Sequence, residues 1–237
     1  MEVPEKVEHR PRVRSPSQRT VAVNVARMRT AARAYAPCVS TRIIVPHRGL
    51  EAAKTRLAPS LSPVEREALA RQLLERVLVA AREACNDVVV ITPSRELRPV
   101  VEPSGARVVV QRGMGLNEGL DQARAEALAD DVETLVVIHG DLPNLHGDDV
   151  LALIDALSAP HAGVGIAPDR AESGTNGLVV RPPGVISFRF GPGSFAAHLE
   201  EAERAGVPVA TVNRPGLAFD LDTPDDLARW LSLGDAA

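Results

Sequence analysis

The sequence predicts an α/β domain built on a mostly parallel sheet. Runs such as Leu135–Ile138 are apolar at every position, which is typical of strands covered on both faces. These runs alternate with segments of helical periodicity in the order strand, helix, strand. The chain has 237 residues, enough for one large domain or two small ones, and 45% are apolar, which is ample for a core. We therefore expect one three-layer α/β/α domain over residues 41–237.

The elements follow from local patterns. Strands are expected over residues 42–46, 87–92, 106–111, 133–138, 163–167, 178–181 and 208–212. Ser62, Pro63 and Glu65 form a capping box that opens a helix running to about residue 84. Further helices are expected over residues 95–101, 117–129, 196–205 and from 224 onward. Thr223–Asp226 caps the last of these, which accounts for Asp225 and Asp226 without any function.

Residues 1–40 predict a flexible basic extension. Residues 1–41 hold 8 Lys+Arg against 3 Asp+Glu, and Pro, Ser and Arg are scattered through them. A transit peptide, or a true start at Met28, would also explain this composition. We expect the extension to be dispensable.

The net charge, the apolar runs and the cysteine count argue against several classes of protein. A net charge of −4 argues against a nucleic-acid binder. No apolar run approaches the roughly 18 residues of a membrane span. The two cysteines, Cys38 and Cys85, show no metal or disulfide spacing, which indicates a reducing cytoplasm. A homodimer is kept as an open expectation.

Three aspartates are the candidate metal ligands. Asp141 follows the apolar run 135–138, and ligands of open α/β sheets sit beyond the carboxyl ends of strands. Asp220 and Asp222 alternate with apolar residues in a stretch, 217–224, that we read as extended, so both point to one face. Clustered carboxylates favour a Mg²⁺ site. The alternative is that Asp141 caps the following turn and Asp222 starts a helix.

The loop after the first strand offers positive charge. Arg48, Lys54 and Arg56 lie near one strand end, where a polyphosphate would bind, although a solvated surface is the alternative. Lys54 stands out because the chain has 25 arginines and only one other lysine.

Two glycine-rich turns are candidate ligand loops. Gly113 and Gly115 precede a helix and permit close approach of a ligand, although Asn117 could simply cap that helix. Gly191 and Ser194 lie at another helix start, a natural seat for phosphate or carboxylate. His198 on that helix is expected to be a packed or surface residue.

These features together indicate nucleotidyl transfer. A cationic loop, acidic metal ligands and no G-x-S-x-G elbow or paired Cys/His suggest that the substrate supplies its own nucleophile.

Six motifs carry a family resemblance: AAKTRL (52–57), GLN (115–117), GDLP (140–143), GTN (174–176), FGPGS (190–194) and PGLAFDLDTPDDL (215–227). In these the chain resembles the guanylyltransferases of coenzyme F(420) biosynthesis, which act on phosphoenolpyruvate or 2-phospho-L-lactate. The resemblance implies a fold like that of nucleotide-sugar and molybdenum-cofactor nucleotidyltransferases, a Rossmann-like sheet of the GT-A kind. It also implies GTP as donor and diphosphate as product.

The resemblance also implies roles for single residues. Asp141, Asp220 and Asp222 would bind Mg²⁺, and Lys54 and Arg56 would hold the triphosphate beside Asp141. Acceptor contacts would come from residues of two motifs: Thr175, Asn176, Gly191 and Ser194. Gly113, Gly115 and Asn117 would lie nearer the nucleoside. His47 departs from the pattern, because a lysine is expected there, and local charge would then depend on pH.

Three rivals stay open on the sequence. A molybdopterin nucleotidyltransferase is disfavoured because the first loop lacks G-G-x-S-x-R-M-G. A metal-dependent glycosyltransferase would use the same Asp-x-Asp logic. A regulatory domain with a dead site would bind GTP without turnover. Among acceptors we favour phosphoenolpyruvate over 2-phospho-L-lactate and 3-phosphoglycerate.

Overall fold

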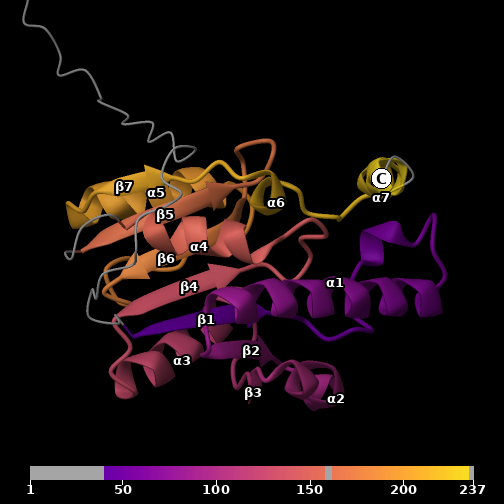
Figure 1. Cartoon of the computed structure of the whole chain (residues 1–237), viewed down its shortest axis with the longest axis horizontal. Helices are drawn as coiled ribbons and strands as arrows, with labels where there is room; N and C mark the ends of the chain where they lie inside the picture. The colour runs from indigo at the N-terminus through magenta and orange to yellow at the C-terminus, as the bar shows by residue number, and fades with distance from the viewer. Residues whose placement is uncertain (1–39, 158–161, 235–237) are drawn as a thin grey trace, which may run out of the picture. The chain divides into compact units, whose positions relative to one another are not determined.

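The computed structural model describes residues 40–157 and 162–234. Its centre is a seven-stranded sheet in the order β3-β2-β1-β4-β6-β5-β7, which Figure 1 shows from bottom to top. The predicted extension, residues 1–40, lies outside the described part of the chain except for Ser40. In the ranges just given, no helix combines the length and the apolar character needed to cross a bilayer.

The strands confirm the predicted α/β class. They span β1 Thr41–Pro46, β2 Val88–Thr92, β3 Arg107–Val110, β4 Thr134–Ile138, β5 Gly163–Pro168, β6 Thr175–Arg181 and β7 Val209–Thr211. Strands β1 to β4 pair in parallel, and so do β5 and β7. Strand β6 runs antiparallel to both β4 and β5, so it enters the sheet from the edge at which β4 ends.

Helices cover both faces of this sheet. The longer ones are α1 Pro63–Ala84, α3 Leu116–Ala129, α4 Gly147–Asp155, α5 Ser194–Ala205 and α7 Pro224–Gly234. Shorter ones are α2 Arg98–Val101, α6 Pro215–Ala218 and the 3-10 turns η2 Thr55–Leu57, η3 Arg95–Leu97 and η4 Glu102–Ser104. The predicted capping box of Ser62 and Glu65 is present at the start of α1.

Alternation along β4 divides the core in two. Val136 and Ile138 pack with residues of α1 and α4, whereas Leu135 and Val137 pack with residues of α3 and α5. Because neighbours along a strand point to opposite faces, an uninterrupted apolar run is what a sheet covered on both sides requires. The three-layer arrangement is thereby confirmed.

Two local predictions are wrong. Strand β6 begins at Thr175 rather than Leu178, because buried polar groups there find hydrogen-bond partners that the sequence does not reveal. The Thr175 hydroxyl contacts His198 Nδ1, and the Asn176 amide donates to the Leu217 carbonyl. The stretch 217–224 is not extended throughout. Pro215 starts a helical turn, α6, that runs to Ala218, since proline suits the first position of a helix.

Candidate active site

Asp141, Asp220 and Asp222 form an acidic cluster, and Lys54 bonds to two of the three carboxylates. Its ammonium donates to Asp141 Oδ2 at 2.9 Å and to Asp222 Oδ1 at 3.0 Å. Its side chain is only 5% exposed. The backbone of Lys54 is left-handed, with φ of 55°, at the point where the first loop turns into η2. Leu221 N–H donates to the Asp141 carbonyl at 3.2 Å, which joins the two acidic segments directly.

The cluster controls the protonation of its members. Burial alone would lower the pKa of Lys54, but the charges of Asp141 and Asp222 raise it above its ordinary value. Burial would raise the pKa of Asp141, and the Lys54 charge holds it below its usual range instead. The Lys54 ammonium therefore stabilises Asp141 in its ionised form.

Asp220 is the third carboxylate of the cluster, and its hydrogen-bond partner is a neutral amide rather than a cation. Its Oδ1 accepts from Asn176 Nδ2 at 3.3 Å, and the same amide donates to the Leu217 carbonyl at 3.0 Å. Burial, followed by the nearby charge of Asp141, raises the pKa of Asp220. The site thus holds more negative charge than Lys54 alone neutralises.

This chemistry suits a divalent cation. Asp141 Oδ1 is buried and has no hydrogen-bond partner, so it is an oxygen left for a ligand. Across the residues that the structure describes, no three acidic, histidine or cysteine side chains are already arranged to hold an ion. In the structure the Lys54 ammonium bridges Asp141 and Asp222. The oxygen donors fit Mg²⁺ in kind, and the third carboxylate still needs a positive partner.

The first loop contributes less free charge than its sequence indicates. Burial lowers the pKa of His47 to about 4, so the imidazole is neutral at pH 7. Its Nδ1 accepts from Gly49 N–H at 3.0 Å, which leaves the ring proton on Nε2. Arg48 is exposed. The Arg56 side chain is 76% exposed and lies 3.6 Å from Asp222 Oδ2, so it can reach a ligand at little cost.

Asn117, in the first turn of α3, bonds to a distant loop and is not the helix cap. Asn117 pairs with the backbone of Phe190 in both directions, accepting from its N–H at 2.9 Å and donating to its carbonyl at 3.0 Å. It does not cap α3, whose N-cap is Gly115 with φ of 112°. Gly113 and Gly115 are exposed, and the Gln111 amide donates to both of their carbonyls.

Thr175, Ser194 and His198 form a second group, which we call the polar corner. Ser194 and His198 lie four residues apart on α5 and therefore face β6 together. Thr175 N–H donates to Ser194 Oγ at 2.9 Å, and Thr175 Oγ1 lies 3.0 Å from His198 Nδ1. All three residues are buried. Gly191, with φ of 133°, lies in the exposed turn just before α5.

The two groups share one edge of the sheet. The residues that end β4 pair with those that begin β6, Ile138 opposite Gly177, and His139 N–H donates to the Asn176 carbonyl at 3.0 Å. Thr175 and Asn176 are adjacent in the strand, so their side chains point to opposite faces. One faces the polar corner and the other faces the acidic cluster.

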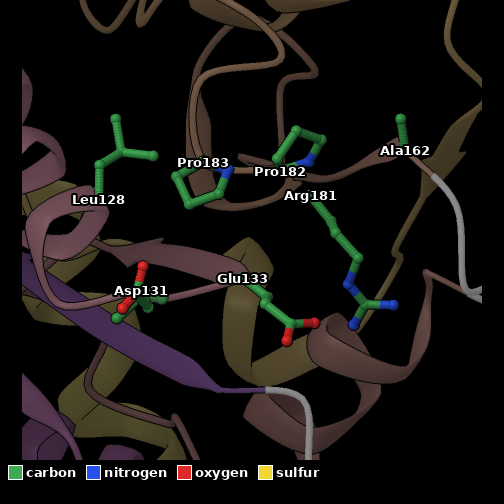
Figure 2. Close-up of a pocket in the computed structure, with 8 residues that line it drawn as sticks. Leu128, Asp131, Glu133, Ala162, Arg181, Pro182 and Pro183 are labelled. Atoms are coloured by element: carbon green, nitrogen blue, oxygen red, sulfur yellow. The ribbon is translucent and has the colours of Figure 1, made fainter.

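Two pockets lie at opposite ends of the strands of the sheet. A pocket of about 330 Å³ is lined by residues that follow β1 and β2, including Arg48, Gly49 and Ser94, at the edge where β4 also ends. A pocket of about 540 Å³ lies at the other edge, where Glu133 precedes β4 and Arg181 ends β6 (Figure 2). The larger pocket is therefore remote from Asp141 and from Thr175.

Sequence reasoning missed two interactions. His198 carries no motif, and its partners Thr175 and Arg189 are distant in sequence, so no spacing could reveal it. The bonds between Asn117 and Phe190 also join segments far apart in the sequence, and the predicted role of Asn117 near the nucleoside stays a prediction. The predicted acidic set, by contrast, does converge.

Named relatives share most of the chain. Two proteins called phosphoenolpyruvate guanylyltransferase are each 42% identical. The one from Sphaerobacter thermophilus covers 80% of this chain and 91% of its own, and the one from Rubrobacter xylanophilus covers 83% and 96%. A 2-phospho-L-lactate guanylyltransferase from Methanothermobacter thermautotrophicus is 33% identical over 83% of this chain and 86% of its own.

Solved structures share the fold. A putative nucleotide-diphospho-sugar transferase from Desulfovibrio desulfuricans superposes with a TM-score of 0.67 at 22% identity, covering 79% of this chain and 84% of that one. A nucleotidyl transferase from Methanothermobacter thermautotrophicus gives a TM-score of 0.59 at 16% identity, covering 82% and 97%. The predicted nucleotidyltransferase-type fold is thereby confirmed.

A family model completes the comparison. The model described as "Guanylyl transferase CofC like" matches residues 41–236, which include the acidic cluster and the polar corner. The chain therefore belongs to the CofC-like guanylyl transferase family.

Proposed function

We propose that this enzyme transfers GMP from GTP to the phosphate of phosphoenolpyruvate in coenzyme F(420) biosynthesis. The products are enolpyruvoyl-2-diphospho-5'-guanosine and diphosphate. The observation that carries the proposal is the acidic cluster around Lys54, beside a neutral polar corner on the same sheet edge. The names of the 42% identical relatives support the choice of nucleotide and acceptor.

The reaction needs no protein nucleophile. An oxygen of the acceptor phosphate attacks the α-phosphorus of GTP, and the bond from that phosphorus to the bridging oxygen of the β-phosphate breaks. Diphosphate leaves with the bonding electrons. Both reactants are anions, so the protein's task is to hold them in line and to offset their repulsion.

The basic residues of the first loop would serve the triphosphate. Lys54 is already desolvated and charged, so its ammonium can interact strongly with phosphate oxygens. Arg56 is exposed and can move toward the ligand. Gly113 and Gly115 offer an exposed backbone for the nucleoside.

We propose that Asp141, Asp220 and Asp222 hold Mg²⁺ when the nucleotide is bound. The unpartnered Asp141 Oδ1 and the raised pKa of Asp220, which follows from burial and from Asp141, support this choice. The ion would supply positive charge at the phosphates undergoing transfer.

The acceptor would lie against the start of β6 and the start of α5. Thr175, Asn176, Gly191 and Ser194 lie there, and helix N-termini favour anionic groups. The same corner could receive 2-phospho-L-lactate or 3-phosphoglycerate, which are the alternatives we retain, and a molybdopterin-type transferase is the more remote one.

Incubation with GTP and Mg²⁺ plus one acceptor at a time tests the proposal. We expect diphosphate release and a product of the matching mass with phosphoenolpyruvate. Turnover with 2-phospho-L-lactate or 3-phosphoglycerate alone would reassign the acceptor. GTP binding without diphosphate release in any mixture would contradict the transferase proposal.

A further inference from the structure

His198 is a buried residue to which neither the resemblance nor the relatives' names give a role. It is fully buried, and both ring nitrogens have partners. Nδ1 lies 3.0 Å from Thr175 Oγ1, and Nε2 accepts from Arg189 N–H at 3.0 Å. The ring therefore bridges the start of β6 and the segment just before the FGPGS turn.

The Arg189 contact fixes the tautomer. A backbone N–H can only donate, so Nε2 must carry the lone pair and a neutral ring carries its proton on Nδ1. That proton faces Thr175 Oγ1, which then acts as the acceptor. The hydroxyl's own proton has no partner among the described residues, since the other Thr175 bond to this corner comes from its backbone N–H.

We propose that His198 is a positioning residue that aims the Thr175 hydroxyl as a hydrogen-bond donor at the anionic acceptor. The inference rests on the proposed function, in which Thr175 contacts the acceptor. A hydroxyl that already accepts from an imidazole N–H is left with donation as its remaining capacity, which suits a carboxylate or phosphate oxygen.

The surroundings keep the imidazole neutral. Burial lowers the pKa of His198 to about 4, assisted by the charge of Arg189 and by His139, while Glu201 and the Ser194 backbone oppose the shift. The Phe190 ring packs edge-on at 4.8 Å between centroids. Protonation would place an N–H on Nε2 facing the Arg189 N–H, so a neutral ring is the only form that satisfies both partners.

Two substitutions of His198 can each remove one of its two hydrogen bonds and keep the other. In His198→Asn the amide nitrogen can take the place of Nδ1, so the bond to Thr175 is kept and the bond to Arg189 is lost. In His198→Gln the longer amide can reach the place of Nε2, so the Arg189 bond is kept and the Thr175 bond is lost. Glu203→Gln, on the exposed part of the same helix, is the matched control.

The measurement is the KM for phosphoenolpyruvate and for GTP, with kcat and the thermal midpoint, in the full-length protein. We expect His198→Gln to raise the acceptor KM by about threefold to tenfold, as the loss of one oriented hydrogen bond predicts. His198→Asn should stay closer to the parent, and the GTP KM should not change in either variant. Thr175→Ser should retain the parental acceptor KM, and Thr175→Val should raise it at least as much as His198→Gln.

A purely structural role gives a different result. In that case both His198 variants lower the thermal midpoint while the ratio of the two KM values stays parental, and the inference is overturned. If neither variant folds, the Thr175 pair decides, because equal acceptor KM values for Ser and Val overturn it as well. Failure of the proposed function is a separate outcome, since the parent protein itself would then release no diphosphate with this acceptor.

Discussion

The acidic cluster and the polar corner lie at the same edge of the sheet. They differ in how completely their charges and hydrogen-bonding groups are paired within the protein. Around Lys54, two carboxylates share one ammonium, Asp220 bonds to Asn176 instead, and Asp141 Oδ1 has no partner. Around Thr175, the groups are neutral, and both nitrogens of His198 are satisfied. The cluster therefore keeps a negative charge that the protein does not fully balance, whereas the hydrogen bonds of the His198 ring are complete within the protein.

This difference predicts how each region responds to substitution. Substitutions in the cluster should change catalysis and stability in opposite or unequal ways, because the protein itself does not balance the cluster's charges. Residues of the corner should alter the acceptor's affinity and the stability together.

Removing the central cation should have the largest effect. Lys54→Met removes the ammonium that Asp141 and Asp222 share and leaves Asp222 with the exposed Arg56 alone. We expect a loss of kcat of about 10²–10³-fold. The free energy of unfolding should fall by about 2–3 kcal/mol, below the usual cost of breaking a buried pair because Asp141 and Asp222 are 26% and 39% exposed. Diphosphate release and urea unfolding measure the two quantities. Arg48→Met, a change at an exposed cation of the same loop, should unfold like the parent.

Asp220→Asn should separate catalysis from stability. We expect turnover to fall by about 10²-fold or more, because a carboxylate of the proposed Mg²⁺ site is lost. The raised pKa of Asp220 means that its ionised form destabilises the fold at pH 7, so the amide should unfold at an equal or higher urea concentration. Parental activity in this variant would rule out the metal assignment.

Asn117→Ala should test which substrate this residue serves. The loss of two hydrogen bonds to Phe190 should lower the free energy of unfolding by about 1–2 kcal/mol. Because those bonds hold the loop before α5, we expect the KM for the acceptor to rise more than the KM for GTP. The opposite order would restore the nucleoside role that the sequence indicates.

Acid should weaken the polar corner through His198. Its pKa is about 4 in the fold and about 6.5 in an unfolded chain, so the unfolded state binds the proton first as the pH falls. Its contribution to stability is complete above about pH 6.5 and is lost progressively toward pH 4, by at most about 1.4 kcal/mol per pH unit. The difference in urea stability between the parent and His198→Asn should therefore shrink between pH 7 and pH 4.5. A constant difference would contradict this assignment.

Asp225→Asn should have the smallest effect. Asp225 is an exposed residue in the first turn of α7, where a carboxylate stabilises the helix terminus by at most about 1 kcal/mol. We expect parental kcat and KM values. A large loss of activity here would mean that the acidic cluster extends beyond its three members.

The sequence predicts the sheet well because its signals are local. The apolar run Leu135–Ile138 and the capping box of Ser62 and Glu65 are each complete within a few residues, and both are found in the structure. The acidic cluster was also predictable, since Asp141 closely follows a buried strand and Asp220 and Asp222 are two residues apart in the sequence. The sequence did not reveal that the Lys54 ammonium bonds to the carboxylates of this cluster.

The interactions that could not be predicted join distant segments. Strand β6 starts three residues early because Thr175 pairs with Ser194 and Asn176 pairs with Leu217, and neither partner lies nearby in sequence. Asn117 and Phe190 are 73 residues apart. In the sequence alone, polar residues of this kind are interpreted as turn or surface residues, because their hydrogen-bond partners are known only from the fold.

The reversed direction of β6 has a consequence for diversification in the family. Strands β5 and β6 form a hairpin whose tip, residues 169–174, opens onto the edge where the acceptor is proposed to lie. Insertions or substitutions at this tip can reshape the seat of the three-carbon acid while β1, β4 and the segment 219–223 keep their registers. One hairpin tip can thus evolve toward a new acceptor while the nucleotide half of the enzyme is inherited unchanged.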